Sequence, residues 1–354
     1  MRRRIFAVSL GILLIFCATA GAQKKKKKGD EDDITQTLPL LKDPPFAVAA
    51  ETGRLVFHVS PLSAKGLLSQ QIREALKSLL QLNRGATIVK LRAFVSGSGD
   101  IRRVQTIVSE VFTDRKLPLP ALSTIQVGAL PMDGAQVIFE SVSVEKKVVN
   151  PQGLAFVSGA AGKNAGEAVR QLQAAAGAAG INPASMLSAT CFLSALDELP
   201  AARTALPGAF PSAVTNYVQP QRLALETSSQ CEAVGRLDKA PASAVVLMSP
   251  QAALVNAPKI ILSGIQMAFG EQDADIHLAF ERMNKELGTQ GVTYKDVFWS
   301  SIYPLTRPVA QRAETIRFEF YDPSHPPAGT ILLFEGLPSL DASAAMDILA
   351  AAPN

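Results

Sequence analysis

The sequence has little that could hold a metal ion or activate a nucleophile. Its 354 residues include three cysteines and three histidines, and His58, His277 and His325 do not stand at metal-ligand spacing with cysteines or acids. Neither a G-x-S-x-G elbow nor a G-x-x-x-x-G-K-S/T loop is present, which argues against an α/β-hydrolase and a P-loop nucleotide-binding protein. We therefore expect no metal site and no cofactor.

The chain also lacks a broadly basic surface. Its formal net charge is +4, and the charges of Arg2–Arg4, Lys24–Lys28 and Asp30–Asp33 together account for that excess. The other residues are close to neutral, whereas a nucleic-acid surface needs clustered lysine and arginine. We therefore expect no nucleic-acid partner. With 47% hydrophobic and 19% charged residues, the composition predicts a globular chain rather than a disordered one.

Long apolar runs are confined to the N-terminus. Three arginines precede the apolar run Ile5–Ala18, and Ala20-Gly21-Ala22 follows it, which is the pattern of a secretory signal peptide over residues 1–22. The run is short for a membrane-spanning helix, so a retained N-terminal anchor is only the alternative. We expect an exported protein, periplasmic or extracellular, with no transmembrane segment after cleavage. Residues 23–42 are predicted to form a charged, flexible leader.

Two cysteines remain after such a cleavage, Cys191 and Cys231, and both fall in strand-like segments. A disulfide between them is permitted outside the cytoplasm. The sequence alone does not give the separation of their Cα atoms. Buried thiols are the favoured interpretation here, with the disulfide as the alternative.

The same order of elements occurs three times along the chain. Each unit begins with an apolar strand that ends in a serine, continues with an amphipathic helix, and then has a second strand, a second helix and two closing strands. The first strands are Leu55–Ser60, Leu154–Gly159 and Ile260–Gly264, and the second strands are Ile88–Val95, Met186–Leu193 and Val297–Tyr303. This pattern predicts three β-α-β-α-β-β units with an extra leading strand, at residues 43–147, 148–238 and 239–354.

The closing strands carry a more specific pattern, at Pro120–Pro131 with Val137–Ser141, at Pro327–Pro338 with Ala345–Ile348, and more loosely at Ser212–Val218 with Gln230–Val234. These segments resemble the closing signature of the Rid family (YjgF-like reactive intermediate deaminases, formerly the endoribonuclease L-PSP family). The resemblance implies an α+β, chorismate-mutase-like fold in each copy. Family members typically form trimers with clefts at the subunit junctions. Three tandem copies would therefore pack as an intramolecular pseudo-trimer in a monomer, with independently tethered domains as the alternative.

The resemblance implies two functional residues in each active copy. An arginine of the signature would bind the substrate carboxylate, and an acid on the last strand would help to place the attacking water. The reaction hydrolyses enamines or imines, such as 2-aminoacrylate, to 2-oxo acids and ammonia. Leu122, Val214 and Gly329 stand at the positions that match the arginine, and none of them binds an anion through its side chain. The positions that match the acid are filled by Glu140, Glu232 and Asp347.

Three functions stay open at this point, one of which is a purely structural role in the cell envelope. The favoured one is a catalytically diverged Rid-like protein that binds a small ligand or a protein partner at the clefts between copies, with Ser60, Ser158, Ser263 and Tyr217 as candidate cleft residues. The alternative is an imine or enamine deaminase in which backbone donors or Arg222 replace the arginine. In that case the three acids are the candidate catalytic residues.

Overall fold

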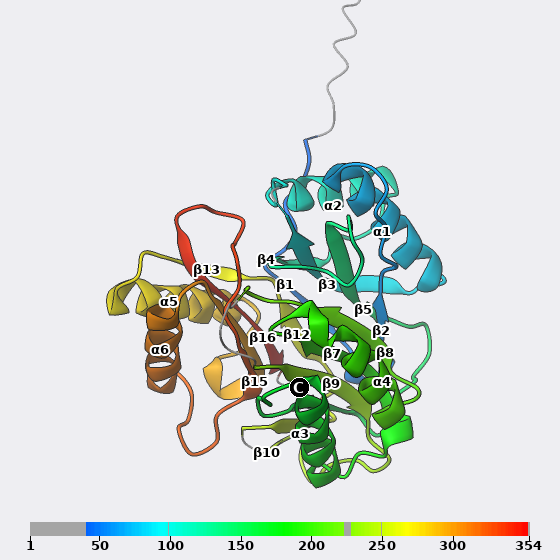
Figure 1. Ribbon diagram of the computed structural model, residues 1–354. Helices are drawn as coiled ribbons and strands as arrows, with labels where there is room; N and C mark the ends of the chain where they lie inside the picture. The colour runs from blue at the N-terminus through cyan, green and yellow to red at the C-terminus, as the bar shows by residue number, and fades with distance from the viewer. Residues whose placement is uncertain (1–39, 98, 223–227, 249, 353–354) are drawn as a thin grey trace, which may run out of the picture. The chain divides into compact units, whose positions relative to one another are not determined.

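The predicted β-α-β-α-β-β order occurs three times (Figure 1). Copy 1 consists of β2 (Leu55–Val59), α1 (Leu68–Leu82), β3 (Thr87–Ser96), α2 (Arg103–Asp114), β4 (Ala121–Val127) and β5 (Val137–Val144). Copy 2 consists of β6 (Leu154–Ser158), α3 (Ala165–Ala178), β7 (Met186–Phe192), α4 (Leu199–Ala209), β8 (Val214–Val218) and β9 (Gln230–Arg236). Copy 3 consists of β12 (Ile260–Ser263), β13 (Gln266–Phe269), α5 (Asp273–Thr289), β14 (Val297–Pro304), α6 (Arg307–Ile316), β15 (Ala328–Ile331) and β16 (Ala342–Ala351). Its first strand is divided into β12 and β13, which both pair antiparallel with β16.

The structure is a computed structural model that describes residues 40–352 except 98, 223–227 and 249. The predicted signal peptide at 1–22 and most of the predicted leader at 23–42 lie outside these residues. Within the described part, no helix combines the length and apolar character that a membrane span requires.

Each copy builds its own sheet in the same way. The strand orders are β2-β5-β3-β4 in copy 1, β6-β9-β7-β8 in copy 2 and β12-β16-β14-β15 in copy 3. The last two strands of each order run parallel, because the second helix crosses over between them. The ladder is interrupted at the same place in every copy, between Ile88 and Lys90, between Met186 and Ser188, and between Val297 and Trp299. A bulge kept in three copies marks a feature that orients particular side chains.

The extra leading strands are exchanged between copies. β1 (Ala47–Ala50), which precedes copy 1, pairs antiparallel with β12 in the copy 3 sheet. β10 (Val245–Met248) and β11 (Ala252–Val255) precede copy 3, but β11 pairs antiparallel with β6 in the copy 2 sheet. The sheets therefore cross the predicted repeat boundaries at two points, which the order of elements along the chain could not show.

The core has two kinds of layer. In each copy the apolar stripes of the two helices pack on one face of that copy's sheet, as Ile72, Leu76 and Leu79 of α1 do with no exposed surface. The opposite faces of the three sheets contribute to two further apolar clusters, and each of these contains residues from all three copies. Both faces of every sheet are therefore covered, and the predicted α+β fold with an intramolecular pseudo-trimer is confirmed.

Cys191 and Cys231 form a disulfide, so the favoured interpretation as buried thiols was wrong. The two residues are directly opposite each other on β7 and β9, with their Cα atoms 4.1 Å apart. Strand register, which places them there, is a long-range property that the spacing of the two cysteines does not reveal.

We expect the Cys191→Ser, Cys231→Ser double variant to be less stable than the wild type by about 4 kcal/mol, because the bridge closes a loop of 40 residues in the unfolded chain. Denaturant unfolding of both proteins under non-oxidising conditions measures the difference. Equal stabilities of the two proteins, or free thiols at both positions in the purified wild type, would contradict the assignment.

Candidate functional site

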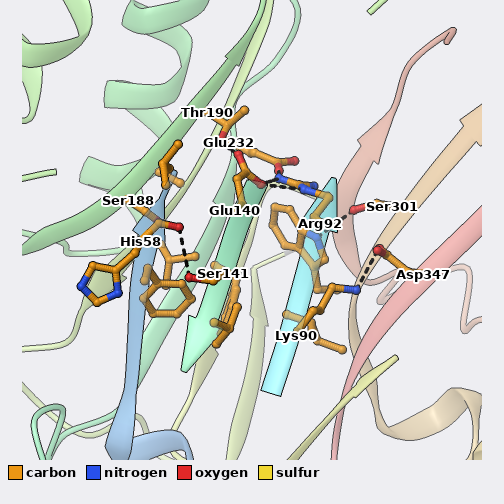
Figure 2. Close-up of a pocket in the computed structure, with 18 residues that line it drawn as sticks. His58, Lys90, Arg92, Glu140, Ser141, Ser188, Thr190, Glu232, Ser301 and Asp347 are labelled. Carbon is orange, nitrogen blue, oxygen red and sulfur yellow. Dashed lines mark hydrogen bonds and ion pairs between the residues drawn. The ribbon is translucent and has the colours of Figure 1, made fainter. Parts of the chain in front are cut away.

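The three predicted acids line one cavity. Glu140 on β5, Glu232 on β9 and Asp347 on β16 contribute to a cavity of about 110 Å³ between the three sheets (Figure 2). They also occupy the same place in their copies, because each lies opposite the same position of the neighbouring central strand. These opposite residues are Arg92, Thr190 and Ser301, respectively. The resemblance to the family signature implied that the three acids occupy equivalent positions, and the strand register places them at equivalent positions.

Each acid accepts a hydrogen bond from a different copy. The donors lie on the parallel edge strands, next to the residues that face the acids: Ser123, Asn216 and Thr330. The bonds are Ser123 Oγ to Asp347 Oδ2 (2.5 Å), Asn216 Nδ2 to Glu140 Oε1 (2.8 Å) and Thr330 Oγ1 to Glu232 Oε2 (3.1 Å). Copy 1 thus donates to copy 3, copy 3 to copy 2 and copy 2 to copy 1. We call this closed set of six side chains the acid ring.

Two cations of copy 1 complete the polar layer. Arg92 points between two carboxylates, since its Nε donates to Glu140 Oε2 over 2.7 Å and its Nη2 pairs with both Glu140 and Glu232 (Figure 2). Lys90 Nζ pairs with Asp347 Oδ2 over 2.7 Å and also donates to the carbonyl of Ser263. The other copies carry uncharged residues at both positions: Ser188 and Trp299 match Lys90, and Thr190 and Ser301 match Arg92. Charge therefore breaks the threefold repetition.

Burial and pairing act against each other on these groups. Burial acts to lower the pKa of Arg92, but Glu140 and Glu232 outweigh it and raise that pKa well above its ordinary value, so the guanidinium stays charged. Burial raises the pKa of Glu232 and lowers that of Lys90, while Arg92 and Asp347, respectively, act in the opposite direction. The layer thus holds buried charges that are stable only as a paired set.

Apolar groups enclose the polar layer. On one side Phe94, Phe192, Tyr303 and Phe334 form a fully buried aromatic cluster, and the Arg92 guanidinium lies 5.1 Å from the ring centre of Phe94. The cavity itself has mainly apolar walls, formed by Phe57, Val142, Phe156, Val234, Trp299 and Leu349. Trp299, the chain's single tryptophan, therefore lines the cavity.

Sequence reasoning missed Lys90 and Arg92. A signal was present, because two cations stand two positions apart inside the apolar strand Ile88–Val95 and so point to the same face of the sheet. Two charges on a buried strand face need partners. Their acidic partners could not be named from the sequence, because Glu140, the nearest of them, is 48 residues from Arg92, and Asp347 is 257 residues from Lys90.

The candidate cleft serines are not brought together. Ser60 Oγ accepts a hydrogen bond from the Phe139 backbone N–H, and Ser263 Oγ accepts one from that of Ile348, both over 2.9 Å. Ser158 lies opposite Glu232 instead and accepts from the Gln230 side chain over 3.1 Å. The serines that end the three strands therefore have three different registers. None of them is among the residues that line the cavity, nor is Tyr217, which packs in the core of copy 2.

The signature position in copy 2 needs a correction. Leu122 lies opposite Leu91, and Gly329 lies opposite Ser300, each one residue before the strand position that faces an acid. In copy 2 the residue at this strand position is Thr215. The assignment of Val214 to the position of the signature arginine was therefore wrong by one residue. None of these three residues is an arginine, and the absence of the signature arginine from the three copies stands.

Arg222 does not replace the missing arginine in the cavity. Its Nε and Nη2 both donate to the carbonyl of Gly128, over 3.0 and 2.8 Å, and its backbone N–H donates to Glu335 Oε1 over 2.9 Å. These contacts join copy 2 to copies 1 and 3. Among the described residues that line the cavity, Arg222 does not occur, so its guanidinium acts as a bridge between copies.

Comparison with known proteins adds a likeness of fold. No family model matches the chain. No curated protein matches it either. Among solved structures, a member of the YjgF/YER057c/UK114 family from Mycobacterium tuberculosis is 16% identical, covers 26% of this chain and 78% of its own, and has a TM-score of 0.24.

A YjgF-family protein from Neisseria meningitidis is 14% identical, with 29% and 85% of the two chains covered and a TM-score of 0.26. Mmf1 from yeast is 12% identical, with 27% and 80% covered and a TM-score of 0.25. These are likenesses of fold alone. The repeated element order and the shared strand register described above show, independently of these comparisons, that the three copies have the same α+β fold.

We expect Arg92→Met to destabilise the protein by about 3–5 kcal/mol at neutral pH, because it leaves two buried carboxylates without their cation. The loss should shrink as the pH falls, since burial already raises the pKa of Glu232 and protonation then removes an uncompensated charge. Denaturant unfolding across a pH series measures both effects.

Arg73→Met is the matched control, because it removes an exposed ion pair. The side chain of Arg73 is 50% exposed and that of its partner Glu110 is 33% exposed. It should cost less than about 1 kcal/mol. Equal losses for the two variants would contradict a central structural role for Arg92.

Proposed function

We propose that this protein of three YjgF-like copies is a non-catalytic binding protein whose central cavity takes a small, uncharged and mainly apolar molecule. The observation that carries the proposal is the acid ring. Every acid that would serve hydrolysis in a deaminase accepts a hydrogen bond from another copy and also pairs with Arg92 or Lys90. Groups committed in this way hold the copies together and are not presented to a substrate.

The charges of the cavity argue against an anionic substrate. Its lining includes three carboxyl groups, two cationic side chains that are already paired, and His58, whose pKa is lowered by burial, which favours the neutral imidazole. A 2-imino acid would bring a further carboxylate into a buried site without a free cation, where repulsion is strong and desolvation is costly. A neutral molecule meets neither penalty.

The size and walls of the cavity define the ligand further. A volume of about 110 Å³ accommodates a molecule of about four or five non-hydrogen atoms, since an apolar cavity of about 150 Å³ binds benzene with its six carbon atoms. Phe57, Phe156 and Trp299 offer it aromatic surface. The hydroxyls of Ser188 and Ser301 lie in the same lining and offer hydrogen bonds to one polar group. A C4 ketone or alcohol has this combination of size and polarity.

We further propose that the protein works outside the cytoplasm. The signal-peptide pattern of residues 1–22 supports this, and so does the Cys191–Cys231 disulfide, since such bonds persist mainly in oxidising compartments. Imine or enamine hydrolysis is the competing function. It would require an anion site that the described residues of the cavity do not offer.

Trp299 makes the proposal measurable, because the fluorescence of the single tryptophan reports on the cavity. We expect 2-butanone and 2-butanol to change that fluorescence saturably, and 2-oxobutanoate to leave it unchanged. Ser188→Leu, which fills the cavity, should abolish the response to the neutral compounds.

The same protein should not accelerate the hydrolysis of 2-iminobutanoate that an amino-acid oxidase generates. Saturable binding of 2-oxobutanoate without a response to the neutral compounds would overturn the binding proposal. Acceleration of imine loss by folded protein would establish the competing function instead.

A further inference from the structure

One strand position that is filled in two sheets is empty in the third. β11 pairs with the outer edge of β6 in the copy 2 sheet, and β1 pairs with the outer edge of β12 in the copy 3 sheet. β2 is the corresponding strand of copy 1, and it stands at the edge of a four-stranded sheet. Among the residues that the structure describes, no strand pairs with its outer side.

The lengths of the linkers explain this difference. The connection from β9 to β12 runs over residues 237–259 and contains β10 and β11. The connection from β5 to β6 covers only residues 145–153, and it contains no strand. Its Val149 and Asn150 backbone N–H groups both donate to the carbonyl of Gly53 over 2.8 Å, and Asn150 Nδ2 donates to the carbonyl of Leu55 over 2.8 Å. The short linker therefore reaches only the start of β2.

The rest of the β2 edge keeps free backbone groups. Hydrogen bonds from Ser60 to Phe139 and from Glu145 to Arg54 flank the β2–β5 ladder. Since bonded and outward-facing residues alternate in an antiparallel pair, Phe57 and Val59 direct their N–H and C=O groups to the outer side. In the described part of the chain these groups have no hydrogen-bond partner, which is the condition for pairing with an added strand.

A groove follows this edge. Leu55–His58 form one wall, and Leu82, Leu187 and Val214 lie among the residues that complete it. Leu82 is 44% exposed and Val214 is 36% exposed, so apolar side chains stand open to solvent beside free backbone groups. Leu187 and Val214 belong to copy 2, so a neighbouring copy lies beside β2. The same arrangement occurs at copy 3, where the strands β3 and β4 of copy 1 lie beside β1 and β12. The groove therefore has the position of the missing strand.

We infer that the β2 edge receives an extended segment of a second polypeptide, about four residues long with small apolar side chains, as an added antiparallel strand. The two strands that fill the equivalent positions define this chemistry, since they are Ala-Val-Ala-Ala (β1) and Ala-Ala-Leu-Val (β11). Arg84 and Arg236 outnumber Glu145 at the groove, and this excess of positive charge favours a segment with an acidic flank. The inference does not depend on the ligand proposed for the central cavity.

The segment comes from another molecule rather than from this chain's own N-terminal part. Asp43 Oδ1 accepts a hydrogen bond from Gln105 Nε2 on α2, and α2 packs against β4, at the edge of the copy 1 sheet opposite to β2. The described part of the chain therefore begins at the edge of the copy 1 sheet that lies opposite to β2.

The test uses a fluorescein-labelled peptide with the sequence of residues 250–258, which contains β11, and the chain without its signal peptide. We expect saturable fluorescence anisotropy, and slower hydrogen exchange of the Phe57 and Val59 amides when the peptide is present. Val214→Lys should weaken binding by about tenfold or more, because it places a charge in the wall of the groove. A peptide N-methylated at the amides that face β2 should weaken it equally without any change to the protein.

Leu278→Lys is the matched control, since Leu278 lies on α5 and is 48% exposed, and it should leave binding unchanged. Absence of binding, or binding that Val214→Lys leaves intact, would overturn the inference. Protection of Phe57 and Val59 without peptide would also overturn it: loss of that protection on deletion of residues 23–39 would identify the chain's own leader as the occupant. A mass of two chains would identify a second copy.

Discussion

The fold depends on one constraint, the burial of three carboxyl groups at the point where three sheets meet. A buried carboxylate is tolerated only when it is paired and hydrogen-bonded. Each of the three acids accepts a hydrogen bond from a different copy, and Glu232 and Asp347 also pair with cations of copy 1, whereas Glu140 pairs with Arg92 of its own copy. The acid ring therefore makes the three copies interdependent, whereas apolar sheet faces by themselves would not fix their relative order.

The same constraint explains how the copies diverged. The polar layer needs cations, but two cations from copy 1 suffice for three acids, because Arg92 pairs with Glu140 and Glu232 while Lys90 pairs with Asp347. The equivalent positions of copies 2 and 3 hold serine, threonine and tryptophan, so they add no charge to the cavity, and Trp299 is part of its apolar wall. Fusion into one chain permits this asymmetry, since a homotrimer repeats every substitution three times. It also permits unequal linkers, which leave the edge of β2 without a partner.

Much of this organisation could be predicted from the sequence, because it rests on local patterns. The apolar stripes of α1, α3 and α5 and the repeated order of elements have periods of a few residues, and the three acids follow a short motif. The features that could not be predicted depend on register between distant strands. The disulfide, the place of Thr215 instead of Val214 and the different registers of Ser60, Ser158 and Ser263 are all of this kind. The partners of Lys90 and Arg92 and the exchanged strands β1 and β11 required the contacts between copies.

A double-mutant cycle across one bond of the acid ring measures how strongly the acids hold the copies together. Thr330→Val, Glu232→Met and the double variant would be compared with the wild type by denaturant unfolding at neutral pH. We expect a coupling free energy of about 1.5–3 kcal/mol, the range of a buried hydrogen bond to a charged group. A coupling within about 0.3 kcal/mol of zero would show that the two copies do not stabilise each other through this bond, and it would contradict the account.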